Sequence, residues 1–237
     1  MKISAFYCIL FAALLATPAC REKSPAIAAQ PTKLYAFAEP SLPLRDQAAE
    51  TGKEIAAIAF GEAVTIENAS GKEENLGGKK GFWAKAQHQG KSGYVFTGYL
   101  SPVPLPQASC KNLLDYARGA FTAEGTETRA YDDPENKGPY RWTQKFAGNI
   151  IAEGYGSINN GAMTLVLPAK DTEIGFHICK RCTAFFRSLT YASFQKQNES
   201  IKECGGRTKL GGCLTIWAIE TTVGENGLTV KCGPESI

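Results

Sequence analysis

Two cysteines in the second half of the chain have a spacing that thiol chemistry uses. Cys179 and Cys182 are separated by two basic residues, after a strand predicted over Ile174–Ile178 and before a helix predicted over Thr183–Ala192. A Cys-x-x-Cys pair at the start of a helix, next to cations, lowers the pKa of a thiol and makes its thiolate reactive. The aromatic residue and the Gly-Pro pair common in that redox motif are absent. Thiol redox chemistry is therefore an alternative to structural disulfide bonding of these cysteines.

Structural disulfides explain more of the cysteines at once. The chain has eight cysteines, of which Cys8 and Cys20 lie near the N-terminus and the other six in the C-terminal half. An even number of cysteines in an exported chain indicates a disulfide framework, although the sequence does not choose the pairing. The six predicted half-cystines are Cys110, Cys179, Cys182, Cys204, Cys213 and Cys232.

Other catalytic or metal-binding arrangements are weakly indicated. A zinc site is not expected, because only Cys179 and Cys182 have finger-like spacing and exported thiols usually oxidise. The two histidines, His88 and His177, fall in different halves of the chain and form no cluster. A wall hydrolase with His177 as base is a further alternative, but no Gly-x-Ser-x-Gly turn accompanies it. We expect no cofactor and no metal, and His177 in a strand.

The N-terminus predicts export. Lys2 precedes an uncharged, mostly apolar run over Ile3–Ala16 that is too short to span a bilayer comfortably. The following Leu14–Cys20 resembles the lipobox of bacterial lipoproteins, in which small residues precede a cysteine that is acylated and becomes the mature N-terminus. Residues 1–19 are then a signal peptide, Cys20 the lipidation site and residues 20–32 a polar tether to the membrane. Thr17 and Pro18 depart from the lipobox pattern, and the alternative is an ordinary signal peptide and a secreted protein.

Length and composition indicate two globular domains. The chain has 237 residues, 43% of them hydrophobic and 21% charged, and its 24 glycines and 12 prolines favour turns and strands. A net charge of +3 predicts no nucleic-acid partner. Three prolines within residues 102–106 predict a stiff linker that holds the two domains apart. The domains are then residues 33–101 and a cysteine-rich domain over residues 107–237.

Short strands separated by turn residues follow one another through residues 33–101. They are predicted over Lys33–Phe37, Leu42–Arg45, Ile55–Phe60, Ala63–Glu67, Trp83–Gln87 and Ser92–Phe96, with a polar loop over Asn68–Gly81. Short, closely spaced strands close most readily into a small barrel.

This segment resembles the bacterial SH3-like (SH3b) domain. The matching pieces are Leu42–Arg45, Ile55–Val64, Phe82–Ala86 and the closing Gly90–Leu100, in the order of the family. Pro43, Leu44, Ala86 and the long Asn68–Gly81 segment depart from its pattern. The resemblance implies a small β-barrel that binds peptidoglycan peptides or cell-wall polymers, or docks a protein.

Five side chains are the candidate ligand-binding residues of this domain. The aromatic ones either stack on a ligand or fill the barrel. The arginine either binds a carboxylate of a wall peptide or pairs with a neighbour such as Asp46 or Glu62. The five candidates are Tyr35, Arg45, Trp83, Tyr94 and Tyr99.

The second domain is predicted to be α+β with an antiparallel sheet. A helix is expected over Cys110–Phe121 with Ser109 as its N-cap, and strand-like alternation runs over Arg141–Tyr155. Hairpins are expected at Ser157–Gly161, ahead of Met163–Leu167, and around Gly224–Asn226.

The sequence thus predicts a mainly β, two-domain protein that is not an enzyme. We expect a membrane-anchored lipoprotein of the bacterial outer membrane or periplasmic face, with a peptidoglycan or envelope-protein ligand and no nucleic acid. The alternative is a periplasmic thiol oxidoreductase or wall hydrolase that uses the C-terminal domain, and a third interpretation is a surface protein that meets a host or partner protein.

Overall fold

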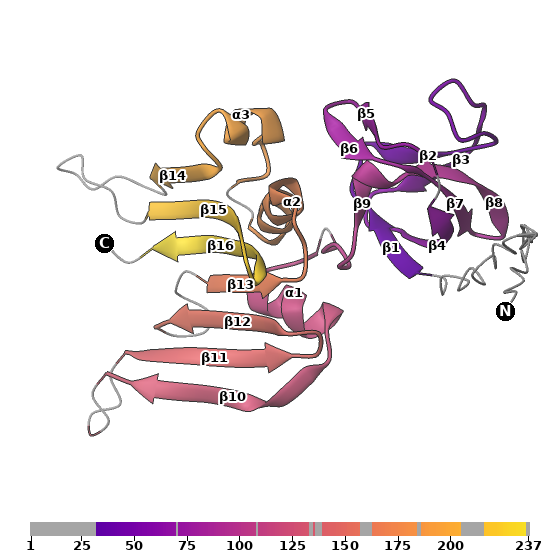
Figure 1. Cartoon of the computed structure of the whole chain (residues 1–237). Coiled ribbons are helices and arrows are strands. Elements are labelled where there is room, and N and C mark those ends of the chain that lie inside the picture. Colours follow the sequence, from indigo (N-terminus) through magenta and orange to yellow (C-terminus); the bar gives the residue numbers. More distant parts are fainter. Residues whose placement is uncertain are drawn as a thin grey trace, which may run out of the picture.

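In the part of the chain that the structure describes, the fold is mainly β, with two antiparallel seven-stranded sheets and three α-helices (Figure 1). The structure, a computed structural model, describes residues 32–69, 71–107, 109–132, 135, 139–156, 163–183, 186–204 and 216–235. The predicted signal peptide, Cys20 and its tether, Cys213 and the Ser157–Gly161 turn lie outside the described residues, as does the side chain of Cys204. Within the described residues no helix is long and apolar enough to cross a membrane.

The first sheet belongs to residues 32–101, here called the N-terminal part. Its order is β3-β2-β8-β7-β4-β1-β9, and a separate small hairpin joins β5 to β6. The strands are β1 Thr32–Ala36, β2 Ser41–Arg45, β3 Glu54–Ala59, β4 Ala63–Ala69, β5 Glu74–Leu76, β6 Lys79–Gly81, β7 Trp83–His88, β8 Lys91–Phe96 and β9 Leu100–Ser101. Strands β3 and β9 are the two ends of this sheet, and among the described residues they do not pair with each other, so the predicted closed barrel is wrong, although the strands themselves are close to those expected.

Two glycine-containing turns join neighbouring strands of the N-terminal part. Gln89 and Gly90 both have positive φ (47° and 76°) and join β7 to β8, as the sequence predicted. Gly77 and Gly78, with φ of 59° and 84°, likewise join β5 to β6 within the segment predicted to be a loop. A two-residue hairpin turn of type I′ needs positive φ at both positions, which glycine adopts without steric cost. The prediction of a plain loop there is wrong. These two strands are short and polar, so they lack the hydrophobic alternation by which a strand is predicted.

The proline-rich segment does not hold two separate bodies apart. Val103 and Leu105 are 2% and 4% exposed and belong to a core cluster that continues into the C-terminal half. The Tyr116 hydroxyl donates to the Pro104 carbonyl at 2.6 Å. Phe37 from the N-terminal part lies in the same cluster. Residues 102–106 therefore pack as part of the core instead of forming an exposed spacer.

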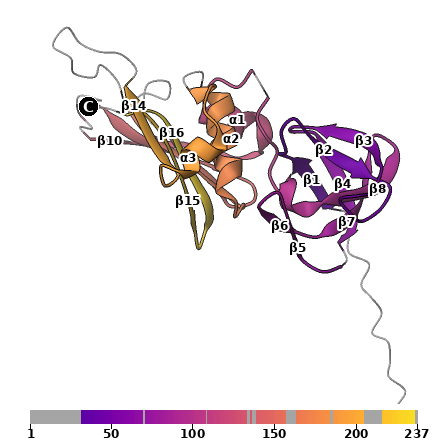
Figure 2. The same ribbon diagram turned by 90° about the horizontal axis from the view of Figure 1, so that it is seen from above.

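The second sheet and the three described helices belong to residues 109–235, here called the C-terminal part. The sheet order is β10-β11-β12-β13-β16-β15-β14. Its elements are α1 Leu113–Ala120, β10 Ala123–Tyr131, β11 Tyr140–Phe146, β12 Ile150–Tyr155, β13 Met163–Leu167, α2 Thr172–Cys182, α3 Tyr191–Gln195, β14 Ser200–Cys204, β15 Ile216–Gly224 and β16 Gly227–Glu235. The helices cover the face of this sheet that is turned toward the N-terminal part (Figure 2).

Several predicted elements of the C-terminal part are corrected by the structure. Ile174–Ile178 is the middle of helix α2 and not a strand, because Asp171 caps a helix that begins at Thr172. The N-cap of α1 is Asn112, whose side chain accepts from the Asp115 amide at 2.8 Å, and not Ser109. The predicted hairpins of β12 with β13 and of β15 with β16 are confirmed.

The predicted disulfide framework is confirmed for four cysteines. Cys110 is bonded to Cys182, and Cys179 to Cys232. The two bonds tie the end of α2 to the segment before α1 and to strand β16. Such bonds indicate an oxidising compartment outside the cytoplasm.

Candidate functional site

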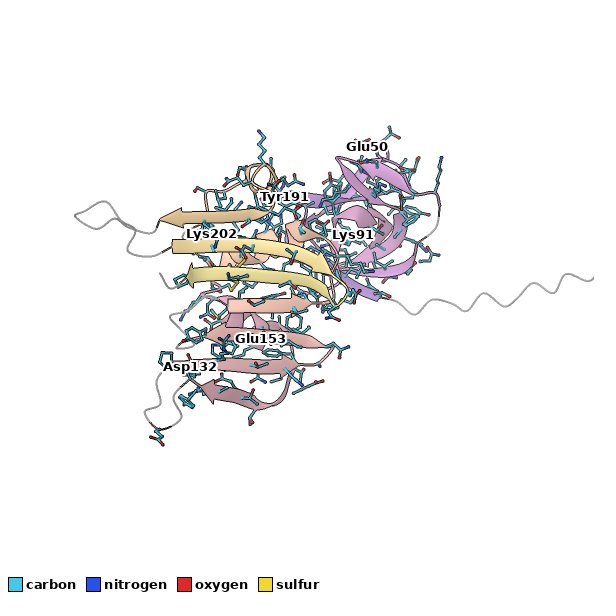
Figure 3. All side chains as sticks on the ribbon, turned by 60° about the vertical axis from the view of Figure 1, so that its left-hand side comes forward. Glu50, Lys91, Asp132, Glu153, Tyr191 and Lys202 are labelled. Carbon is cyan, nitrogen blue, oxygen red and sulfur yellow. A yellow bond between two sulfur atoms is a disulfide. The ribbon has the colours of Figure 1, made fainter. Side chains whose placement is uncertain are left out.

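A pocket of about 410 Å³ lies between the two parts of the chain. Strand β2, the β1–β2 turn and aromatic side chains of the N-terminal part form one wall, while α2 and the start of α3 form the other. Figure 3 shows Tyr191 of α3 on the side of the C-terminal part that faces the N-terminal part. Pockets of this size bury most of a small ligand.

The alternation of β2 brings polar groups to the pocket. Leu42 and Leu44 are buried in the core of the first sheet, at 2% and 0% exposure. Because successive side chains of a strand point to opposite faces, Ser41, Pro43 and Arg45 lie on the other face, and all three line the pocket. One short strand thus serves both the core and the site.

The Arg45 guanidinium lacks a charged partner among the described residues. Its Nη1 donates to the Gly52 carbonyl at 2.7 Å, and its buried Nε has no hydrogen-bond partner there. The two predicted partners are used elsewhere, since Asp46 accepts from the Lys53 amide and Glu62 from the Ala59 amide. A buried donor left unpaired is costly, so Arg45 is suited to an anionic group on a ligand.

The aromatic wall of the N-terminal part is rigid. Trp83 and Phe96 face each other across β7 and β8, with ring centroids 5.6 Å apart in an edge-to-face arrangement. The Trp83 indole donates to the Glu74 carboxylate at 3.1 Å, and the Tyr99 hydroxyl donates to the Leu76 carbonyl at 3.1 Å. The β5–β6 hairpin therefore fixes two of the rings. Burial, reinforced by the charge of Glu173, raises the pKa of Tyr99 and keeps its hydroxyl protonated.

Lys79 joins the two parts beside the pocket. Its ammonium lies 2.7 Å from Asp171 Oδ2 and 2.5 Å from Glu173 Oε2, at the first turn of α2. It also lies over the rings of Phe37 and Tyr191, at 5.2 and 5.5 Å from their centroids. Burial alone would lower the pKa of Lys79, but hydrogen bonds to the two carboxylates outweigh it and raise that pKa.

His177 of α2 also lines the pocket. It is 4% exposed, and its Nδ1 has no hydrogen-bond partner among the described residues. Its Nε2 lies 3.5 Å from Glu173 Oε1. Burial would raise the pKa of Glu173, but hydrogen bonds from His177 and Lys79 outweigh it and lower that pKa. Glu173 is therefore ionised and held by its neighbours, so it is not a free general base.

Three of the five predicted ligand-binding residues meet in the pocket. Arg45, Trp83 and Tyr99 line it, whereas Tyr35 and Tyr94 do not. Tyr35 lies on β1 with the Lys33 ammonium 5.5 Å from its ring, and Tyr94 pairs with Arg45 across β2 and β8. The sequence did not predict the side of the pocket that comes from α2 and α3, and it indicates His177 only as the base of a hydrolase. The residues on this side are Glu173, Phe176, His177, Lys180, Thr190 and Tyr191.

The cysteine pair is not arranged for redox exchange. Cys179 and Cys182 lie in the last turn of α2 and not at a helix N-terminus, so the helix dipole does not favour their thiolates. Each is bonded to a distant cysteine, and both are at most 1% exposed. The described residues also contain no group of three or more histidine, cysteine or acidic side chains that could hold a metal ion.

The pocket can therefore bind a ligand by stacking and by charge. Its rings offer flat apolar surfaces, and Arg45 and Lys180 offer cations at two of its sides. Comparison with protein families, with characterised proteins and with solved structures finds no match to this chain. The interpretation of the site therefore depends on its own geometry.

Proposed function

We propose that this protein is an exported lipoprotein of the bacterial cell envelope that binds a cell-wall peptide or polymer without catalysis. In this proposal Cys20 carries the lipid anchor, an SH3b-like domain over residues 33–101 supplies one side of the binding site, and a disulfide-bonded domain supplies the other. An envelope-protein ligand would use the same pocket.

One observation carries the proposal most directly. Arg45, Trp83 and Tyr99, selected from the sequence as ligand-binding candidates, line one pocket together with aromatic and basic side chains of the C-terminal part. A peptide with a free carboxylate could pair with Arg45, which has no carboxylate within ion-pair distance among the described residues. Rings on both walls would hold the apolar part of such a ligand.

Co-sedimentation with purified sacculi tests the binding role. The full exported chain should be retained, and Arg45→Gln should weaken retention about tenfold or more, because a charge-assisted hydrogen bond contributes about 1.5–3 kcal/mol. Lys53→Gln is the matched control, because it also removes one charge from an exposed side chain, just before β3. Equal retention of Arg45→Gln and wild type would contradict a ligand in the pocket.

The anchor is tested separately. Cys20→Ser should release the protein from membranes into the soluble exported fraction, because no cysteine thiol remains at that position to be acylated. Unchanged membrane partitioning of Cys20→Ser would contradict lipidation. It would not bear on the binding role, which the sacculus assay tests.

A further inference from the structure

A second cavity adjoins the pocket at the C-terminal end of α2. It has a volume of about 260 Å³ and is lined by Glu39, Lys180, Arg181 and Arg187. Glu39 and Lys180 also line the first pocket, so the two cavities are neighbours. Three cations and one carboxylate thus surround this second cavity.

Glu39 neutralises these cations only in part. Its carboxylate oxygens lie 3.5 Å from Arg181 Nη2, 3.8 Å from Lys180 Nζ and 3.7 Å from His177 Nδ1. Charge-assisted hydrogen bonds are about 2.7–2.9 Å long, so none of the three is a full hydrogen bond. The Glu39 side chain is also 44% exposed, which leaves it free to move. The basic side chains therefore keep hydrogen-bonding capacity that Glu39 does not use.

Packing holds Arg181 in place for a further partner. Its guanidinium carbon lies 3.8 Å from the centroid of the Phe60 ring, and its buried Nε has no hydrogen-bond acceptor among the described residues. Arg187 is exposed, and the described residues place no carboxylate within ion-pair distance of it. The dipole of α2 favours cations in its last turn, but that interaction uses none of their N–H donors.

We propose that this cavity is an oxyanion site, at which a phosphate or carboxylate group displaces Glu39 from Lys180 and Arg181. Arginine binds both kinds of oxyanion through paired N–H donors, and lysine adds a point charge. Glu39 occupies the site as an internal anion when no ligand is present. The idea that this oxyanion is part of the ligand in the neighbouring pocket rests on the proposed function. The oxyanion site itself does not rest on it.

Titration of the full exported chain with inorganic phosphate tests the site, and a parallel titration with citrate at the same ionic strength separates phosphate from carboxylate recognition. Binding is followed by calorimetry, with chloride as the reference anion. Arg187→Gln should weaken binding of the preferred anion roughly tenfold, since it removes a charged donor. Lys145→Gln, which removes one exposed charge from β11, should leave it unchanged. Arg187 is preferred to Arg181 for this test because Arg181 also packs on Phe60.

Glu39→Gln provides a test of opposite sign. Removing the internal anion should tighten phosphate or citrate binding. Weaker binding by Glu39→Gln would mean that the carboxylate only supports the local structure, and it would overturn the proposal. Equal weakening by Arg187→Gln and Lys145→Gln, or binding of neither anion, would also overturn it. None of these results depends on sacculus retention, so failure of this site and failure of the proposed function are distinguishable.

Discussion

Replacing Lys79 by glutamine should loosen the contact between the two parts of the chain. The substitution removes one ammonium that is 17% exposed and that contacts Asp171 and Glu173 at 2.7 and 2.5 Å. Two charged hydrogen bonds are lost, at about 1.5–3 kcal/mol each, and relief of the desolvation of the ammonium returns part of that cost. We expect a net loss of about 2 kcal/mol. For a chain of this length such a loss lowers the unfolding temperature by about 4–8 °C.

Thermal unfolding followed by circular dichroism measures this loss, and Lys85→Gln is its control. Lys85 pairs with Glu67 at 3.1 Å within the first sheet, and its side chain is 46% exposed. Such exposed pairs contribute little to stability, so Lys85→Gln should lower the unfolding temperature much less. If the two variants unfold at the same temperature, Lys79 does not stabilise the contact between the two parts.

Three further predictions concern the same framework. The pKa of Glu173 is below its usual 4.5, and the pKa of Lys79 is above its usual 10.5. The difference in unfolding free energy between wild type and Lys79→Gln should therefore be largest between these two pH values. It should shrink as the pH falls below 4.5 or rises above 10.5. Gly154→Ala would bring a Cβ within 2.5 Å of the Trp142 indole, which is 2% exposed, and should destabilise by about 1–3 kcal/mol in urea unfolding. Reducing the two disulfides, which close 72- and 53-residue separations, should cost about 4 kcal/mol each in the same assay, and no loss of stability would contradict these bonds.

The sequence predicted most of the first sheet because its strands obey local rules. Val64 and Ile66 alternate with less buried neighbours in β4, as a half-buried strand requires. Gln89 and Gly90 sit between two alternating runs and form the expected turn. Closure of a barrel, in contrast, depends on pairing between the ends of the sheet, and no local pattern reports that pairing.

Helix α2 was mispredicted because burial hides its period. All residues from Ile174 to Cys179 are buried, so no polar face marks a 3.6-residue repeat. Gly175 even packs against Thr221 and Val230, where a Cβ would lie within 2.9 Å of both side chains. The signals that could have found the helix were at its ends, namely Asp171 as N-cap and the basic residues of its last turn.

Only half of the candidate site could be predicted from the sequence, because the other half depends on packing between distant segments. Arg45, Trp83 and Tyr99 belong to a motif read along one segment, whereas His177 and Tyr191 reach the pocket through the packing of α2 and α3. Nothing in the spacing of these residues connects segments so far apart in sequence. The predicted strand over Ile174–Ile178 also concealed His177 as a residue of the site.

The most direct test of the account is whether a ligand needs both parts of the chain. Tyr191 of α3 lines the pocket, whereas Tyr35 of β1 does not. In sacculus co-sedimentation of the full exported chain, Tyr191→Ala should weaken retention about tenfold, in line with the contribution of a stacked aromatic side chain. Tyr35→Ala should be retained like wild type. The reverse result, with Tyr35→Ala weakened and Tyr191→Ala retained, would place the ligand on the N-terminal part alone and contradict a site between the two parts.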